Sequence, residues 1–591
     1  MKRWSVSLCV VGLAGCQVRQ HDLGPQPQVS RLPQCVGDVS TEPVVEPVVA
    51  PPAISGGTLA VMGDGTMVVA DPDRDQLYVV GTDDEVATVP LEAGAEPGRV
   101  IEGPAARALV VLRRRPQVVE LDVGAATIVA RHSVCAVPRG IAWAPAPRAT
   151  LYVACAGGEL ARLVWNGSVF TPGNTTMVVP DLRDVVVTPN GVLVSTFRSA
   201  ELYTVSESGA VVRHAVTGVG SEAPHVAWRM AAGPGGKVAI SHQTATSESL
   251  GLAACVDTAE EAEALGADAG FGYGGSGGAI IPSVTTVDVS GGHPEPVGTW
   301  QLFGAGALPV DTAYSASGMR LAVVLAGSQV VHVQEPVQGG VRTTPLVMKA
   351  PTAVGFRGEA VVVFNREPAQ LVIEPGTSSA RTISLSTLSR RSTSHELFHQ
   401  ATGSALACAS CHPEAGDDGF TWTIGGELFR TPTLRGGLGG TEPFHWKGDQ
   451  ADVTALMGDV FRKRMLGPKL SQPQAEALLG WLDAQPRLPA PTLDSASVAR
   501  GRDLFESTQV GCAACHVGAH GTNNASADVG TGGAFQVPRL DELAYRAPYL
   551  HDGSAASIEQ RLEVGGDGVH GRTVQLTVGE RADLAAYLRS R

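Results

Sequence analysis

Residues Met67–Val80 read MVVADPDRDQLYVV, two short apolar runs that flank a polar turn. Apolar runs of this length joined by turn-forming residues predict an antiparallel β-hairpin. Six further units of the same strand–turn–strand form follow along the chain. The seven units begin at Met67, Arg107, Thr150, Val192, Lys237, Arg320 and Glu359. Successive starts are 39 to 45 residues apart, with one longer gap of 83.

The spacing of these hairpins indicates the architecture of residues 51–385. A period of about 40–45 residues built from short strands is typical of a four-stranded propeller blade. One blade cannot bury both of its faces, so we expect an all-β propeller of about seven blades. A β-sandwich is the alternative, but its strands would not repeat so evenly. The longer gap contains residues 245–281, which show no alternating run, and we interpret them as an insertion in one blade rather than an eighth blade.

The composition fits a multidomain globular protein. The chain has 591 residues, of which 17% are charged and 43% hydrophobic, which is enough for several cores and too apolar for general disorder. Its net charge of −14 argues against a dedicated nucleic-acid-binding protein. Beyond the N-terminal stretch the sequence has no run of 18 or more apolar residues, so no transmembrane helix is expected.

The N-terminus has the pattern of an export signal. Met1-Lys2-Arg3 is basic, and the apolar stretch that follows ends in Leu-Ala-Gly-Cys16. This segment resembles a bacterial lipoprotein signal, which implies cleavage after residues 1–15 and lipidation of Cys16. Residues 16–50 are Pro-rich and predict an extended tether. Since Gln17 follows the cysteine, the resemblance implies the outer membrane of a Gram-negative bacterium, facing the periplasm or the cell surface. An ordinary secretory signal is the alternative.

The ten cysteines fall into distinct groups. Cys9 and Cys16 belong to the signal region, and four others form two CxxC pairs. The remaining four are Cys35, Cys135, Cys155 and Cys255. An even number of thiols in an oxidising compartment favours disulfides, with three possible pairings. Cys135 and Cys155 are close enough in sequence to join neighbouring strands, and buried free thiols are the alternative.

Two CxxCH pentapeptides carry the strongest chemical signal. They are CASCH at 408–412 and CAACH at 512–516. The motif is the attachment site of c-type haem, in which two thiols form thioethers and the histidine binds iron. The predicted attachment residues are Cys408, Cys411, His412, Cys512, Cys515 and His516. A zinc knuckle or a redox dithiol is the alternative, but two copies in an exported chain favour two covalent haems.

The two motifs lie in segments that are copies of one another. Short helices are expected before each motif, and amphipathic helices close each copy at 473–484 and 580–590. Trp481 and Tyr587 hold the same place in the closing helices. In cytochrome c folds the first and last helices cross, with an aromatic residue packed on a glycine or an aromatic. We therefore expect two all-α cytochrome c-type domains after the propeller, over residues 386–490 and 491–591.

The last third of the chain resembles the bacterial di-haem cytochrome c peroxidase family, which includes the methylamine-utilisation di-haem enzymes. The similarity rests on the two CxxCH modules together with PTLR at 432–435 and PYLHDG at 548–553. It implies haem-based redox chemistry and, as one possibility, turnover of hydrogen peroxide. The second copy departs from the family pattern at Asp541, where the PxLR segment would have arginine.

The sixth iron ligand would separate electron transfer from catalysis, because a six-coordinate iron has no site for peroxide. In the first copy Met465 precedes the closing helix, where small cytochromes c place their methionine; Met457 and His445 are weaker candidates. In the second copy His570 takes the equivalent place, and His551 is the other imidazole. The alternatives are a core methionine and a surface histidine.

These patterns predict an exported, lipid-anchored di-haem c-type cytochrome that transfers electrons, with the propeller as scaffold or docking domain. The expected partner is a redox protein that donates or accepts electrons, and the membrane is reached only through the N-terminal lipid. One alternative is a di-haem peroxidase that reduces hydrogen peroxide or oxidises a protein substrate. The other is a propeller-based surface interaction protein with accessory haem modules. The acidic net charge predicts that small basic donors are steered in at low salt.

Overall fold

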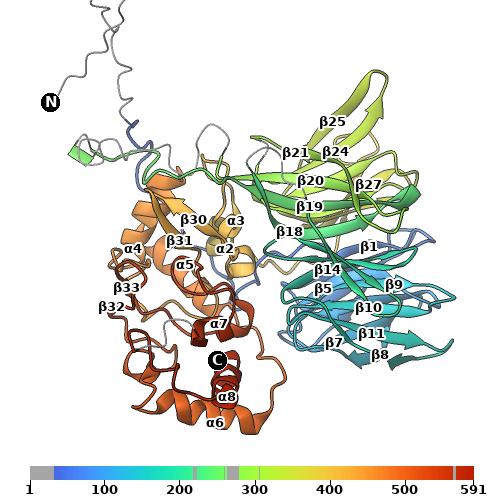
Figure 1. Cartoon of the computed structure of the whole chain (residues 1–591). Coiled ribbons are helices and arrows are strands. Elements are labelled where there is room, and N and C mark those ends of the chain that lie inside the picture. The colour runs from blue at the N-terminus through green and yellow to red at the C-terminus, as the bar shows by residue number, and fades with distance from the viewer. Residues whose placement is uncertain (1–31, 217–221, 259, 262–277, 305, 564–567) are drawn as a thin grey trace, which may run out of the picture.

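Seven antiparallel sheets of consecutive strands form a ring in the N-terminal part of the chain (Figure 1). The computed structural model describes residues 32–591 apart from 217–221, 259, 262–277, 305 and 564–567. Blades one to four contain β1 (Leu59–Val61), β2 (Met67–Asp71), β3 (Gln76–Val80), β4 (Val86–Pro90), β5 (Pro97–Glu102), β6 (Arg107–Leu112), β7 (Gln117–Asp122), β8 (Thr127–Ser133), β9 (Pro138–Ala144), β10 (Thr150–Cys155), β11 (Glu159–Trp165), β12 (Phe170–Pro172), β13 (Thr176–Met177), β14 (Leu182–Thr188), β15 (Gly191–Thr196), β16 (Leu202–Ser206) and β17 (Val211–His214). Blades five to seven contain β18 (Ala223–Ala232), β19 (Lys237–Ala245), β20 (Ile280–Asp288), β21 (Glu295–Gln301), β22 (Pro309–Tyr314), β23 (Leu321–Leu325), β24 (Val330–Val337), β25 (Gly340–Val347), β26 (Pro351–Arg357), β27 (Ala360–Arg366), β28 (Ala369–Ile373) and β29 (Arg381–Ser384).

The seven-bladed propeller confirms the fold class expected from the hairpin period. In six blades the hairpins seen in the sequence are the two middle strands, as in the pairing of Met67 with Val80 between β2 and β3. These strands are buried on both faces because each blade packs between two neighbours. The ring closes where blade one meets blade seven, through a shared core that includes Met67, Tyr78 and Phe364.

The long gap between hairpins is an insertion within blade five, as expected. β19 and β20 pair directly, with Ala245 opposite Ile280, so the insertion starts and ends at the same end of this strand pair. The described part of this insertion reaches the helical region, where the Leu250 amide donates to the Thr423 carbonyl and the Ala254 amide to the Lys463 carbonyl. One segment of the propeller therefore lies against the helical part of the chain.

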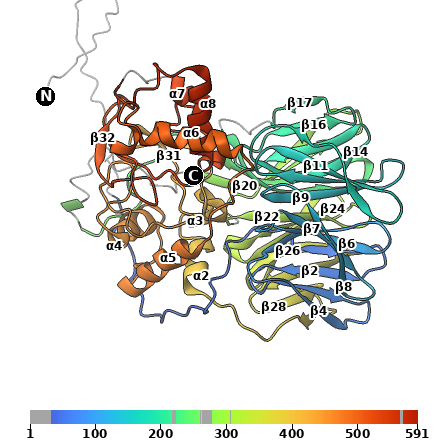
Figure 2. The same ribbon diagram turned by 90° about the horizontal axis from the view of Figure 1, so that it is seen from below.

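The helical part consists of two copies, here called the first module (residues 386–490) and the second module (residues 491–591), which lie against one side of the propeller (Figures 1 and 2). The first module contains α2 (Thr393–His399), α3 (Cys408–Cys411), β30 (Thr421–Ile424), β31 (Glu427–Arg430), α4 (Val453–Leu456), a π-helix (Met457–Arg464) and α5 (Gln472–Ala484). The second contains α6 (Ser495–Glu506), β32 (Ser526–Asp528), β33 (Ala534–Gln536), α7 (Ile558–Glu563) and α8 (Val578–Arg589). Short 3-10 turns occur at Pro234–Gly236, Ala326–Ser328, Pro413–Ala415, Cys512–Ala514 and Leu543–Tyr545.

The helix crossing expected from the sequence is present in both modules. Phe398 of α2 packs on Trp481 of α5 with ring centroids 5.0 Å apart, and Phe505 of α6 packs on Tyr587 of α8 at 5.1 Å. In the second module the helices touch at Gly501, where a Cβ atom would lie 1.9 Å from the Asp583 carbonyl oxygen. The copies also share a β-hairpin between the motif and the closing helix.

The described part of the N-terminal segment, residues 32–50, lies along the first module and is called the strap below. The Ser40 amide donates to the Lys469 carbonyl, and Glu46 accepts hydrogen bonds from the hydroxyl groups of Ser392 and Ser394. The predicted signal and Cys16 lie outside the described residues. Among the residues that the structure describes, no helix is long and apolar enough to cross a membrane.

Four cysteines form two disulfides, which settles the pairing that the sequence left open. Cys135 pairs with Cys155 after β8 and at the end of β10, as their spacing suggested. Cys35 of the strap pairs with Cys255 of the blade-five insertion, 220 residues away. The second bond joins two segments that both contact the first module.

Candidate functional site

The first module surrounds a cavity of about 530 Å³, within the usual size range of ligand and cofactor pockets. Its lining includes Cys408, Cys411 and His412 of the first pentapeptide. Leu250 and Leu252 of the blade-five insertion also line it, as do residues of the second module. The wall is largely apolar, as an aromatic ring system requires.

The histidine of each pentapeptide is held by backbone carbonyls. His412 Nδ1 lies 3.3 Å from the Gly416 oxygen, and His516 Nδ1 lies 2.9 Å from the Gly521 oxygen. If Nδ1 donates to these carbonyls, the lone pair of Nε2 is left to bind a metal. Burial lowers the pKa of both imidazoles. Nearby backbone carbonyls, which include those of Pro432 and Pro538, act in the opposite direction but do not outweigh burial. Both rings are therefore neutral at pH 7 and able to act as ligands.

The four cysteines of the pentapeptides are free thiols, whereas the other four described cysteines are oxidised to disulfides. Burial raises the pKa of Cys408 to about 12 and that of Cys512 to about 11. Two unpaired thiols and a buried imidazole beside an apolar cavity fit a covalently attached haem.

Met465, the predicted sixth ligand of the first site, is 5% exposed and lines the same cavity as His412. It directly follows the π-helix, a geometry that is frequent at functional sites. The weaker candidates Met457 and His445 line this cavity as well. His445 is engaged by Asp449, whose carboxylate lies 3.0 Å from Nδ1.

In the second module the structure brings His570 to His516 and leaves His551 elsewhere. The ring centroids of His516 and His570 are 6.3 Å apart, and the ring planes are inclined by 26°. Arg561 Nε donates a hydrogen bond to His570 Nδ1 at 3.1 Å. Because Nδ1 accepts this bond, Nε2 of the neutral ring carries the hydrogen, so His570 binds iron through Nε2 only when the contact with Arg561 is broken. His551 instead stacks on Phe535 at 3.7 Å. His551 therefore belongs to the boundary between the modules, where Trp446 of the first module lies 6.3 Å away.

The two sites share a wall. Pro538 lines the cavity of the first module, and its backbone carbonyl also interacts with His516 of the second. Trp446, to which the sequence assigned no role, lines the same cavity and donates from Nε1 to the Arg430 carbonyl. Pro538 thus belongs both to the wall of the first cavity, which His412 also lines, and to the surroundings of His516.

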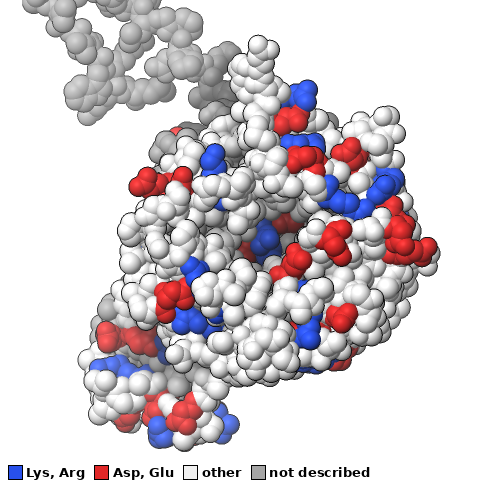
Figure 3. Space-filling view, turned by 90° about the vertical axis from the view of Figure 1, so that its right-hand side faces the viewer, with Lys and Arg blue, Asp and Glu red and all other residues white. Residues whose placement is uncertain are grey.

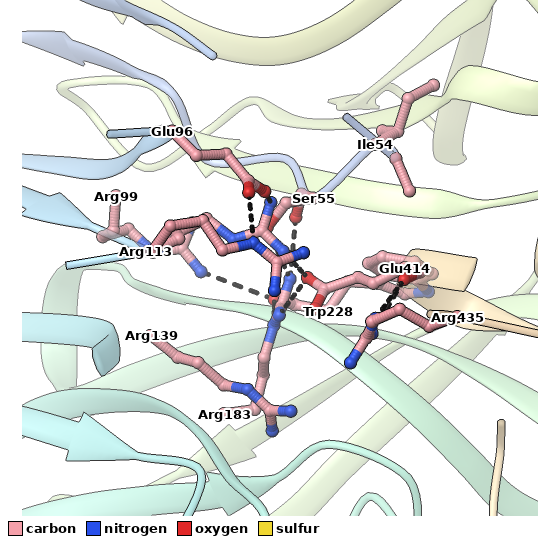
Figure 4. A network of polar contacts seen from close by, with 12 residues as sticks. Ile54, Ser55, Glu96, Arg99, Arg113, Arg139, Arg183, Trp228, Glu414 and Arg435 are labelled. Atoms are coloured by element: carbon pink, nitrogen blue, oxygen red, sulfur yellow. Dashed lines mark hydrogen bonds and ion pairs between the residues drawn. The ribbon is translucent and has the colours of Figure 1, made fainter. Parts of the chain in front are cut away.

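The propeller builds part of the first site, which the sequence did not predict. Glu414, two residues after His412, is buried and bonded to two propeller arginines (Figure 4). Its carboxylate lies 2.6 Å from Arg183 Nη1 and 2.9 Å from Arg113 Nη2. Burial alone would raise the pKa of Glu414, but the guanidinium groups around it hold that pKa well below its ordinary value.

Two further contacts tie the loop after the pentapeptide to the propeller. Asp417 accepts a hydrogen bond from Arg198 at 2.8 Å, and Gln243 of β19 donates to the Ser410 carbonyl at 2.9 Å. Arg183 lies on β14, the innermost strand of its blade, whereas Arg113 and Arg198 follow the second strands of theirs. Charged residues on innermost strands, at or beside the interface, are Arg99, Arg139, Arg183, Asp184, Arg229 and Asp311. Buried charge within a strand was the signal that could have revealed this interface.

The opposite face of the propeller is open. Figure 3 shows it hollowed at the centre, with both basic and acidic side chains inside the hollow. One axial face thus holds the first module, and the other is exposed to solvent.

Several known proteins are similar to parts of this chain. The hydrazine synthase subunit gamma of Kuenenia stuttgartiensis is 24% identical over 259 residues, which cover 32% of this chain and 72% of that protein. Among solved structures, hydrazine synthase of the same organism aligns with a TM-score of 0.43 and 15% identity, over 58% of this chain and 99% of that one. Virginiamycin B lyase from Staphylococcus aureus aligns with a TM-score of 0.37 and 12% identity, over 52% and 91%. Residues 498–591 match the family model described as cytochrome c, so the second module is a cytochrome c domain, and this family implies a covalently bound c-type haem.

Proposed function

We propose that this chain is an exported, lipid-anchored di-haem c-type cytochrome that transfers electrons. The observation that carries the proposal is the arrangement of each module around its pentapeptide histidine. Each histidine has a second candidate ligand: Met465 lines the cavity of the first module, and the ring centroid of His570 lies 6.3 Å from that of His516 in the second. Two six-coordinate irons suit electron transfer, because neither leaves a position for a substrate.

Each residue of the two sites has a distinct role in this proposal. The cysteine pairs at 408/411 and 512/515 form the thioether bonds. His412 and His516 supply the first axial ligands, and Met465 and His570 the second. When bound, haem supplies a reversible one-electron couple between ferric and ferrous iron. The carbonyls of Gly416 and Gly521 orient the imidazoles, since a hydrogen bond at Nδ1 sets the tautomer and the plane of the ring.

The two irons would have different sixth ligands, and this difference would set the direction of electron transfer between them. A thioether ligand raises the reduction potential relative to a second imidazole, so the first site is the better acceptor. The wall shared at Pro538 keeps the two sites close. Electrons would then enter at the second module and pass to the first.

Reduction of hydrogen peroxide is the second candidate function. The observation that favours it is that His445, paired with Asp449, lines the first cavity together with Met465. If Met465 leaves the iron open, an imidazole is available there for the two protons that accompany two electrons in the conversion of peroxide to two waters. A surface interaction protein with accessory haems is the third candidate, for which the open face of the propeller is the relevant feature (Figure 3).

The proposed location and partner follow from the sequence. Cys16 would anchor the chain to the outer membrane, and the redox partner would be a small protein. The net charge of −14 favours a basic partner, whose association rate would fall as salt screens the attraction.

The decisive experiment uses the purified exported protein. Intact mass and a pyridine haemochrome assay should count two haems per chain, and electron paramagnetic resonance should show two low-spin ferric irons. One high-spin iron that reacts with peroxide would favour the peroxidase. A colourless protein with the mass of the lipidated polypeptide would refute the proposal.

A further inference from the structure

Three side chains that line the first cavity have buried polar atoms without a hydrogen-bond partner among the described residues. They are Arg430 Nε, Thr433 Oγ1 and Arg546 Nε. Their residues are 3%, 3% and 7% exposed, respectively. A buried donor without a partner costs stability, most of all when it carries charge, so three such donors around one cavity indicate a missing acceptor.

The other nitrogens of both arginines are held in place. Arg430 Nη2 donates to the Asp417 carboxylate at 2.7 Å and to the Arg546 carbonyl at 2.6 Å. Arg546 Nη1 donates to the carbonyls of Arg539 and Asp541 at 2.9 and 2.8 Å. Each guanidinium is therefore oriented by the hydrogen bonds of one terminal nitrogen, Nη2 in Arg430 and Nη1 in Arg546, while its Nε has no partner among the described residues. This is the geometry of a prepared anion site rather than of a flexible surface arginine.

The charge balance at this place also calls for an anion. Arg539 lines the cavity too, and burial together with the neighbouring Arg546 lowers its pKa to about 10. Burial also lowers the pKa of Arg430, although the nearby Asp417 carboxylate acts to raise it. The hydrogen bonds that Arg546 donates among the described residues all go to carbonyls rather than carboxylates. Arg430 and Arg539 each lie near a carboxylate, that of Asp417 at 2.7 Å and that of Asp541 at 3.9 Å, whereas Arg546 has no ion pair among the described residues. A bound carboxylate, which matches a guanidinium in shape, would neutralise the unpaired charge of Arg546.

We infer that Arg430 and Arg546, with the Thr433 hydroxyl, bind carboxylate groups, and that these are the carboxylates of the tetrapyrrole held by the first module. The inference rests on the proposed function, because haem carries two such groups. Arg430 belongs to the first module and Arg546 to the second, so both modules contribute a side chain that binds the carboxylates. The positive charge they meet there favours the ferrous state and raises the reduction potential of the first site.

The test uses full-length holoprotein and spectroelectrochemical titration of both haems. Arg546→Gln and Arg430→Gln should each lower the midpoint potential of the first haem and leave that of the second unchanged, since an unneutralised carboxylate stabilises ferric iron. Arg546→Lys retains the charge and should recover most of the potential. The matched control is Arg74→Gln in blade one, an arginine that is equally buried, paired with Asp71 and absent from the cavity wall. Both potentials should be unchanged in this control.

Thr433→Val offers a milder variant that preserves side-chain shape, and it should lower the same potential by a smaller amount. If haem content is intact and Arg546→Gln, Arg430→Gln and Thr433→Val all leave both potentials unchanged, the inference is wrong and the proposed function stands. If Cys408 and Cys411 carry no haem by peptide mass, both fail for the first module. If added acetate shifts the wild-type potential at constant ionic strength, the site binds a free carboxylate, and the assignment to haem is wrong.

Discussion

The imidazole rings of His516 and His570 lie with their centroids 6.3 Å apart and their planes inclined by 26°. A metal–imidazole bond measures about 2 Å, so two rings that bind one metal from opposite sides have centres roughly 6 Å apart. The two residues are 54 positions apart in the sequence, and the fold of the second module brings them to this separation. Their geometry is the basis of the first prediction.

Replacing His570 by alanine should convert the second iron from low-spin to high-spin, because the sixth ligand is lost while His516 remains. The altered protein should also bind carbon monoxide in its reduced form. Visible and electron paramagnetic resonance spectra measure both effects. His551→Ala is the matched control and should retain a low-spin iron, since its ring stacks on Phe535. A low-spin second iron in His570→Ala would contradict the assignment.

Replacing Met465 by histidine should lower the midpoint potential of the first haem, because imidazole stabilises ferric iron more than a thioether does. The charge-transfer band of methionine-ligated ferric haem should disappear at the same time. Met457→Leu, a change in the same cavity, should preserve the band. If Met457→Leu abolishes the band and Met465→His does not, Met457 is the ligand.

Glu414→Gln should destabilise the contact between propeller and first module. It leaves Arg183 buried without a carboxylate partner among the described residues, whereas Arg113 keeps its pairing with Glu96, and breaking a buried pair costs about 3–5 kcal/mol. The expected result is a lower melting temperature by calorimetry. Arg213→Gln, at an exposed ion pair with Glu201, should change it little. An unchanged melting temperature in Glu414→Gln would show that this contact contributes little.

The same carboxylate predicts a dependence on pH. The pKa of Glu414 is depressed in the folded chain, so its stabilising effect is complete above the unfolded value of about 4.3 and is lost as pH falls through the folded pKa. The difference in melting temperature between wild type and Glu414→Gln should therefore be large at pH 7 and shrink only in strong acid. A difference that shrinks on raising the pH would contradict this sign.

Gly501→Ala should destabilise the second module, because the new methyl group would meet the Asp583 carbonyl at 1.9 Å and the Tyr587 Cβ at 2.8 Å. Overpacking of this kind costs about 1–3 kcal/mol or more. Gly480→Ala in α5 is the control: nothing lies within 4 Å of its Cβ position, and alanine favours a helix. Denaturant titration should show a loss for the first variant and no loss for the second.

Patterns with a short period were readable from the sequence. The middle strands of six blades are apolar and regularly spaced, so seven blades and the insertion in blade five could be predicted. The helix crossings followed from the paired aromatics Trp481 and Tyr587. The innermost strands were missed because buried charges such as Arg183 and Asp184 interrupt their apolar alternation.

The sequence by itself determined the local chemistry of this protein, because a pentapeptide such as CASCH contains its thiols and its imidazole within about one turn of chain. Only the tertiary structure decided which distant groups complete each site. The choice of His570 over His551, the pairing of Cys35 with Cys255 and the seating of Glu414 among propeller arginines all join residues far apart in the chain. Burial and charge pairing select such contacts, and both act through space rather than along the sequence.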